Sequence, residues 1–209
     1  MDRAGWDRAY AGSDLVWSAG PNQWVEEVAA DLPPGRALDL ASGEGRNALW
    51  LAERGWAVTA VDFSAAGLAR ARMLADRRLG EHADRLTLVE ADLEDYTPAA
   101  GTYDFVIVAY FQVAAELRRA VLRAAADAVA PAGLLLVVAH DSDNIARGFG
   151  GPQDAARLYT ARDAAADIDG HGLRVVTAEA RSREVATDGG PRTAIDAFLL
   201  ARRPERTAP

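Results

Sequence analysis

The stretch RALDLASGEGRNALWLAERGWAVTAVDFS, residues 36–64, decides the fold. It opens with a short apolar strand, Ala37–Ala41, which carries a single charge at Asp39. A turn with Gly43 and Gly45 follows. Glycine has no Cβ atom, so these two positions allow a sharp turn and let a ligand approach the backbone closely.

The second half of this stretch predicts a helix, another strand and an acid at the end of that strand. The helix runs from Arg46 to about Arg54, and Gly55 suits its end. The strand Ala57–Val61 is buried, and Asp62 follows it. Glycines before a helix N-terminus, with a carboxylate able to accept ribose hydroxyls, indicate a nucleotide-type site.

The composition limits the kinds of protein that this chain can be. With 209 residues it is expected to form one domain, and a net charge of −8 argues against a nucleic-acid partner. The absence of cysteine and lysine excludes disulfides, thiolate zinc sites and Schiff-base chemistry. The three histidines lack metal-site spacing, so no metal site is predicted. With no long apolar run and no basic-then-apolar leader, we expect a cytoplasmic protein without membrane spans.

The remainder of the chain alternates short apolar strands with helical patterns and ends in two longer strands. This predicts a single-domain, Rossmann-like, doubly wound α/β sheet of seven strands with a C-terminal antiparallel hairpin. Asp188–Pro191 reads as the hairpin turn. The later expected strands are Leu86–Glu90, Asp104–Tyr110, Leu134–Ala139, Arg174–Ala186 and Thr193–Arg202.

Side chains that could bind a ligand or take part in catalysis follow several of these strands. Asp92 comes after the third strand, Tyr110 ends the fourth, and His140 ends the fifth. Ligands of such sheets bind outside the carboxyl ends of the strands, so we expect these residues to meet Gly43 and Asp62 at one rim.

His140 is the candidate general base, because an unperturbed imidazole titrates near ~6.5 and accepts a proton at neutral pH. Alternatively, it orders the long loop that follows, residues 142–159, by hydrogen bonding. Asp141 either orients the imidazole or caps this loop.

The two ends of the chain have different patterns. Residues 1–20 carry Trp6, Tyr10 and Trp17, which is unusual for a disordered tail. They either pack as a structural arm or form a lid over the ligand. Residues 204–209 are expected to be a loose tail.

A dinucleotide-binding oxidoreductase shares the glycine turn and the following acid, but three features count against it. Asp39 lies inside the first strand, and the sequence ASGEGRN lacks the usual third glycine. In addition, Asp92-Leu93 follows the third strand, where the carboxylate can accept an adenine amino group and the leucine can cover the ring.

At this point the chain resembles the class I S-adenosylmethionine-dependent methyltransferases over almost its whole length. The matching motifs are DLASGEG (39–45), YDFVIVAY (103–110) and the Pro-x-Gly at 131–133. Ala41 stands where many members have a glycine. The segments WDRAY, SAGPN and GEGRN look like the small-molecule branch that includes tellurite-resistance and thiopurine methyltransferases.

The resemblance implies S-adenosylmethionine as cofactor, with S-adenosylhomocysteine as product. Tyr110 and His140 would serve methyl transfer. Arg46 would reach the cofactor carboxylate or else pair with Glu44, which is expected to face solvent. By position, the cofactor-binding residues would be Tyr10, Trp17, Ala41, Gly43, Gly45, Arg46, Asp62, Phe63, Asp92, Leu93 and Ala109.

The expected activity is methyl transfer to a small-molecule acceptor by in-line displacement, at an oxygen, nitrogen, sulfur or other chalcogen atom. The chain would act as a monomer or homodimer. The alternatives are a non-catalytic cofactor-binding module and a nicotinamide-dependent oxidoreductase.

Overall fold

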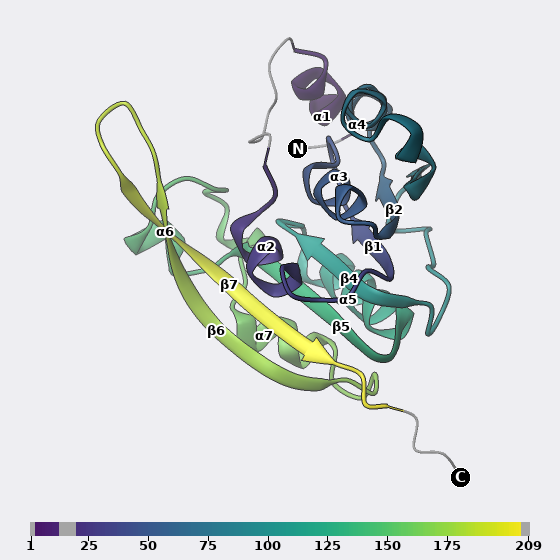
Figure 1. Ribbon diagram of the computed structural model, residues 1–209. Helices are drawn as coiled ribbons and strands as arrows, with labels where there is room; N and C mark the ends of the chain where they lie inside the picture. Colours follow the sequence, from purple (N-terminus) through teal and green to yellow (C-terminus); the bar gives the residue numbers. More distant parts are fainter. Residues whose placement is uncertain (1–2, 13–19, 206–209) are drawn as a thin grey trace. The chain divides into compact units, whose positions relative to one another are not determined.

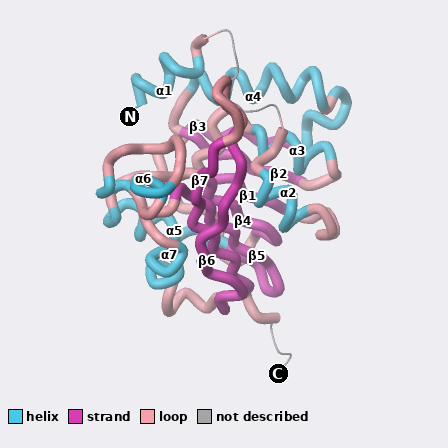
Figure 2. Tube along the Cα trace, turned by 90° about the vertical axis from the view of Figure 1, so that its left-hand side faces the viewer, coloured by secondary structure: helices cyan, strands magenta, loops and turns pink. Residues whose placement is uncertain are grey.

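The computed structural model describes residues 3–12 and 20–205 and contains one seven-stranded sheet (Figure 1, Figure 2). The strand order is β3-β2-β1-β4-β5-β7-β6. The predicted α/β sheet with a C-terminal antiparallel hairpin is confirmed. The chain also divides into two compact units, residues 1–97 with 102–107 and residues 98–101 with 108–209, which are described separately below. That the chain forms a single domain stays a prediction.

The first unit holds the parallel strands and the helices that connect them. β1 pairs with β2 and β2 pairs with β3, all in parallel. β1 is almost wholly buried, as expected for a strand covered on both faces. The elements are α1 (Arg3–Tyr10), α2 (Gln23–Ala29), β1 (Arg36–Leu40), α3 (Arg46–Glu53), β2 (Ala57–Asp62), α4 (Ala65–Arg78), the 3₁₀ turn Gly80–Arg85 and β3 (Leu86–Glu90).

The second unit is built around two antiparallel pairings, β5 with β7 and β6 with β7. In this register His140 lies directly opposite Asp196. Its elements are α5 (Ala115–Ala128), β5 (Val129–His140), α6 (Asn144–Arg147), the 3₁₀ turn Ala155–Arg157, α7 (Ala161–Asp167), β6 (Arg174–Val185) and β7 (Arg192–Arg202). β4 (Tyr103–Ala109) crosses from the first unit into the second.

Three segments differ from the sequence-based expectation. β5 starts at Val129 rather than Leu134, because the helix ends at Ala128 and Ala132 takes a left-handed conformation (φ 65°) within the strand. The aromatic arm contains a helix, α1. The loop after His140 contains α6 and a 3₁₀ turn. Within the described ranges, no helix combines the length and apolar character needed to cross a membrane.

Candidate functional site

The turn after β1 is built from backbone conformations that L-residues avoid. Ala41, Gly43 and Gly45 have φ angles of 58°, 55° and 76°. A Cβ atom on Gly45 would lie 3.0 Å from the Cβ of Ala71, so this glycine is required both by conformation and by the packing of α4. The turn is thus compact and presents backbone rather than side chains.

Asp62 braces this turn from the end of β2. Its Oδ2 accepts a hydrogen bond from the Gly43 amide at 2.8 Å, and its Oδ1 accepts one from the Ser64 amide at 2.9 Å. Burial raises the pKa of Asp62, and these amide donors oppose that rise. The acid predicted to bind ribose therefore also shapes the glycine turn.

Two side chains at the same turn hold buried oxygens without a hydrogen-bonding partner. Asp39 is 1% exposed, and across residues 3–12 and 20–205 neither of its carboxylate oxygens nor the Ser42 Oγ makes a hydrogen bond. Burial raises the pKa of Asp39 to about 7. The Arg46 charge and the nearby Ala48 amide oppose this rise, and the Asp62 charge adds to it. Buried polar atoms are normally paired, so these three oxygens point to a ligand.

The arm helix α1 lies beside α4 at this end of the first unit (Figure 1). Asp7 accepts a hydrogen bond from the Ser64 hydroxyl at 2.5 Å and from the Ala66 amide at 3.4 Å. Tyr10 is 5% exposed and stacks on Trp6, with ring centroids 5.4 Å apart. The arm is thus packed onto the first unit, and the cofactor contact predicted for Tyr10 stays a prediction. Trp17 lies outside the described residues.

Arg3 of α1 reaches the ends of β2 and β3. Its guanidinium lies 5.5 Å from the Phe63 ring centroid, 3.5 Å from the Glu90 carboxylate and 3.8 Å from that of Asp92. Asp92 also accepts the Glu94 amide at 3.1 Å, and Leu93 is half-buried. The structure thus brings Phe63 and Asp92 to one side of the first unit, and their contacts with a cofactor stay predictions.

The prediction for Glu44 was wrong. Its side chain is 3% exposed rather than solvent-facing, and it accepts a hydrogen bond from Arg70 of α4 at 2.8 Å. The ion pair forms because Gly43 and Gly45 turn the backbone so that Glu44 faces α4. Arg46 is half-buried at the start of α3, and its contact with a cofactor carboxylate stays a prediction.

In the second unit, the structure brings the two predicted catalytic residues together. The rings of Tyr110 and His140 lie 5.0 Å apart, centroid to centroid. The Tyr110 hydroxyl donates to Asp196 Oδ2 at 3.0 Å, and Arg183 Nε donates to the same oxygen at 2.7 Å. Tyr110 also has a φ of 56°, the kind of strained conformation that gathers at functional sites.

The cluster at the end of β5 contains two residues that were predicted from the sequence, Tyr110 and His140, and two that were not. Asp141 caps the following loop, as one of its two interpretations predicted, because its Oδ1 accepts the Asp143 amide at 2.9 Å. Asp196 and Arg183 were missed because they lie within the hairpin strands, where alternating charges look like a solvated face. An acid in the otherwise apolar run AIDAFLL was the available signal. Ala109, the last residue of β4, is half-buried.

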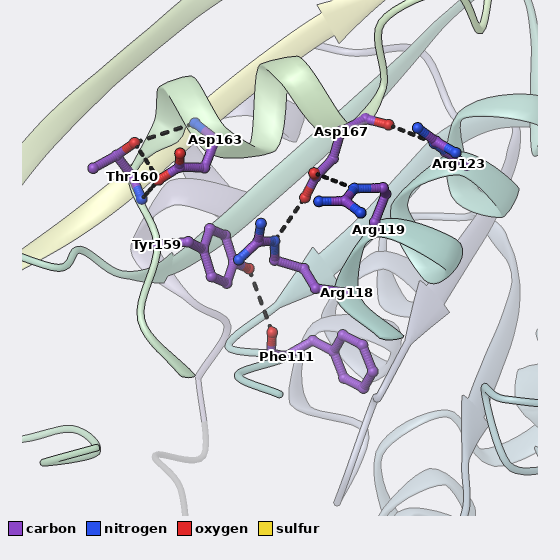
Figure 3. Close-up of polar contacts among 8 residues, drawn as sticks. All are labelled: Phe111, Arg118, Arg119, Arg123, Tyr159, Thr160, Asp163 and Asp167. Carbon is purple, nitrogen blue, oxygen red and sulfur yellow. Dashed lines mark hydrogen bonds and ion pairs between the residues drawn. The ribbon is translucent and has the colours of Figure 1, made fainter. Parts of the chain in front are cut away.

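A second buried polar cluster joins α7 to α5 (Figure 3). Arg118 donates to Asp167 at 2.6 Å, and the Tyr159 ring lies 4.6 Å from the Arg118 guanidinium. The Tyr159 hydroxyl donates to the Phe111 carbonyl at 3.4 Å. Burial raises the pKa of Tyr159, so it stays neutral. This cluster anchors the end of the long loop and has the character of a structural support.

The left-handed conformation of Ala41 gives a direct test of the turn. A non-glycine residue in this region costs about 1–2 kcal/mol, whereas glycine costs about 0.5–1 kcal/mol of chain entropy. We therefore expect Ala41→Gly to keep or raise the free energy of unfolding in urea. Ala37→Gly, in the regular part of β1, should lower it by at least ~0.5–1 kcal/mol. An equal decrease in the free energy of unfolding for Ala41→Gly and Ala37→Gly would contradict a strained conformation at Ala41.

The turn and its bracing acid lie within a segment that matches a known domain family. Residues 37–133 match the family described as "Methyltransferase domain". This segment of the chain is thus similar to that family. YqeM of Bacillus subtilis (strain 168), which is named as a candidate methyltransferase, is 30% identical over 145 residues, or 65% of this chain. The chain spans 55% of YqeM, about half the length of that relative.

Several solved methyltransferase structures share the fold of this chain. TehB from Haemophilus influenzae is 18% identical with a TM-score of 0.69, covering 96% of this chain and 66% of its own. Magnesium protoporphyrin IX methyltransferase (ChlM) from Synechocystis PCC 6803, solved with bound S-adenosylmethionine, is 20% identical with a TM-score of 0.64. The coverage is 96% of this chain and 90% of ChlM. The expected fold is confirmed, and the matched segment agrees with the expected family.

Proposed function

We propose that this chain transfers a methyl group from S-adenosylmethionine to a small-molecule acceptor. The observation that carries the proposal is that three buried oxygens of Asp39 and Ser42 at the glycine turn have no hydrogen-bond partner among the described residues. A net charge of −8 favours a small acceptor over a nucleic acid. The acceptor atom is oxygen, nitrogen, sulfur or another chalcogen.

The residues of the turn fit this cofactor chemically. S-adenosylmethionine carries an ammonium and a sulfonium, and a buried carboxylate without a protein partner, Asp39, is a suitable counter-charge. Gly43 and Gly45 leave backbone open to close approach, and Asp62 and Asp92 supply acceptors for hydroxyl and amino hydrogens. When bound, the cofactor supplies an electrophilic methyl group.

The remaining chemistry falls to the second unit, where His140 accepts a proton from the acceptor. Burial lowers the pKa of His140, which the Asp196 charge opposes and the Arg183 charge reinforces. The imidazole is therefore neutral at pH 7 and competent as a base. Tyr110, packed against its ring, contributes to the surface on which the acceptor binds.

Calorimetry and a methyl-transfer assay test this function together. We expect saturable binding of S-adenosylhomocysteine, no saturable binding of NAD(H), and transfer of labelled methyl to at least one member of a panel of thiols, phenols, amines and chalcogen oxyanions. His140→Gln should lower turnover by about 10²–10⁴-fold without weakening cofactor binding, because general-base catalysis typically contributes that much.

The two alternatives predict different outcomes of the same experiment. Tight cofactor binding without transfer to any member of the panel would indicate a non-catalytic binding module. Binding of NAD(H) with no heat from S-adenosylhomocysteine would favour the oxidoreductase. Unchanged turnover in His140→Gln would show that His140 is not the general base, and it would leave the assignment of the cofactor intact.

A further inference from the structure

Asp196 lies at the centre of a polar cluster whose members come from β5, β6, β7 and the residue after β4. It is fully buried on β7, directly across the strand pairing from His140 on β5. Arg183 of β6 and Tyr110, which follows β4, both donate to its Oδ2. A buried carboxylate is costly unless it is paired, and here the Arg183 guanidinium supplies the opposite charge.

The His140 ring faces this carboxylate with one particular nitrogen. Nδ1 lies 3.6 Å from Asp196 Oδ1 and makes no hydrogen bond with any described residue. A shift of about 0.6 Å would bring the pair to ordinary hydrogen-bond length. Loose contacts of this kind are common in ligand-free catalytic sites and tighten in the complex.

The charged and titratable groups around the imidazole are few and come from separate elements. β7 presents Asp196, β6 presents Arg183, and the turn after β4 presents Tyr110. Asp141 turns its carboxylate toward the amide of Asp143, and Gln112 reaches only the His140 backbone carbonyl. Asp196 is thus the acceptor that faces Nδ1.

The loop after β5 packs against the His140 ring. Asn144 holds the loop to β7, because its side chain donates to the Gly150 carbonyl at 2.8 Å and accepts the Ile195 amide at 2.7 Å. This places Gly151 against the imidazole, where a Cβ atom would lie 2.6 Å from Cδ2 and 2.9 Å from Nε2. Any side chain at position 151 would overlap the imidazole ring, so only glycine fits there.

We propose that Asp196, held by Arg183, is a positioning residue that keeps the proton of neutral His140 on Nδ1 and the lone pair on Nε2. It follows that the acceptor is one that must lose a proton to be methylated, a thiol or a phenol-type hydroxyl. This inference rests on the proposed methyltransferase function and deepens it.

The step balances with the groups named. The acceptor X–H gives its proton to Nε2 of His140 as X forms a bond to the methyl carbon. The electron pair of the breaking carbon–sulfur bond goes to sulfur, leaving S-adenosylhomocysteine. The imidazolium, stabilised by Asp196, then returns its proton to water. An amine acceptor that arrives neutral has no need of this base before transfer.

Nitrogen-15 NMR of the imidazoles tests the positioning without any substrate. The chain has three histidines, and His140→Gln identifies the His140 signals. We expect wild-type His140 to be protonated on Nδ1 and unprotonated on Nε2 at neutral pH. Asp196→Asn should lower the His140 pKa and lose this tautomer, whereas Arg183→Gln should raise the pKa. The exposed Asp143→Asn is the control and should change neither.

Opposite shifts of the His140 pKa in Asp196→Asn and Arg183→Gln would support the proposal. A proton on Nε2 of His140 in the wild type, or no pKa shift in either variant, would overturn it. If Asp196→Asn does not fold, Arg183→Gln decides: a raised His140 pKa supports the proposal, and an unchanged or lowered His140 pKa overturns it. A failure of the proposed function would show differently, as a correctly positioned His140 in a protein that transfers no methyl group.

Turnover with 2-mercaptoethanol and phenol as acceptor probes, both of which are protonated at neutral pH, tests the chemical consequence. Asp196→Asn should reduce kcat by at least tenfold with little change in cofactor affinity, since the wrong tautomer disables a base. Gly151→Ala should reduce kcat similarly. Gly150→Ala is its matched control, because Gly150 shares the positive φ (72° against 76°) but its Cβ would touch nothing within 4 Å. Equal activity of Gly151→Ala and Gly150→Ala, or transfer only to amines, would contradict the proposal.

Discussion

Asp39→Asn is expected to weaken the binding of S-adenosylhomocysteine by ~10–100-fold, the loss typical of one hydrogen bond to a charged group. The reason is that Asp39 is the buried, unpartnered carboxylate at the glycine turn, and asparagine keeps its shape but removes its charge. Isothermal titration calorimetry measures the loss. 5′-Methylthioadenosine, which lacks the ammonium, should bind both proteins alike.

The same substitution is expected to stabilise the protein in the absence of cofactor. The pKa of Asp39 rises from 3.8 to about 7 on folding, so the folded state holds a proton that the unfolded state has released between these pH values. The free energy of unfolding therefore falls with increasing pH across that window, by at most about 4 kcal/mol. Asp39→Asn removes this pH dependence. After the cost of burying the asparagine amide, the free energy of unfolding of the variant should exceed that of the wild type by ~1–3 kcal/mol at pH 8.

The control for Asp39→Asn is Asp84→Asn, which removes the same charge at an exposed position in the same unit. It should leave both cofactor affinity and the pH dependence of unfolding unchanged. Wild-type affinity in Asp39→Asn would show that the unpartnered carboxylate does not face the cofactor. A variant less stable than wild type at pH 8 would show that Asp39 has a partner in the folded protein.

Asp167→Ala is expected to destabilise the second unit by about 3–5 kcal/mol, because it leaves the Arg118 guanidinium buried without its partner. Arg118 and Asp167 are both nearly inaccessible, with side chains 8% and 5% exposed (Figure 3). Urea unfolding followed by far-UV circular dichroism measures the loss. All five tryptophans lie between residues 6 and 56, so their fluorescence reports the first unit separately.

Two comparisons separate burial of the pair from the mere loss of a charge. Asp143→Ala removes the exposed pair between Asp143 and Arg147 and should cost less than about 1 kcal/mol. The double variant Arg118→Met with Asp167→Leu should recover most of the stability, since it leaves no unpaired charge. Equal losses for Asp167→Ala and Asp143→Ala would contradict the importance of burial.

Local chemistry explains why most of the fold could be predicted. The strands at residues 86–90 and 174–185 and the helix at 161–167 follow from apolar runs, glycine and proline breaks and a capping threonine, Thr160. The start of β5 could not be predicted in this way, because the strand continues across Pro131, a residue type that favours a break in isolation.

In the candidate site, too, some features could be predicted from local sequence and others depend on contacts between distant segments. Gly43, Gly45 and Asp62 could be predicted because a ligand-binding turn needs these residue types close together in sequence. The burial of Glu44 depends on Arg70, which belongs to another helix, and the importance of Asp39 depends on the absence of any partner for its carboxylate. Neither fact is visible in a motif.

The sequence by itself determined the sheet class, the glycine turn and the two candidate catalytic residues, because periodicity and turn chemistry act between neighbours along the chain. Only the tertiary structure decided that Asp39 is unpartnered and that Asp196 faces His140 across paired strands. His140 and Asp196 are 56 positions apart, so their pairing depends on strand register rather than on local preference. The electrostatic environment of each acid was set in the same way, by burial and by charges brought from distant segments.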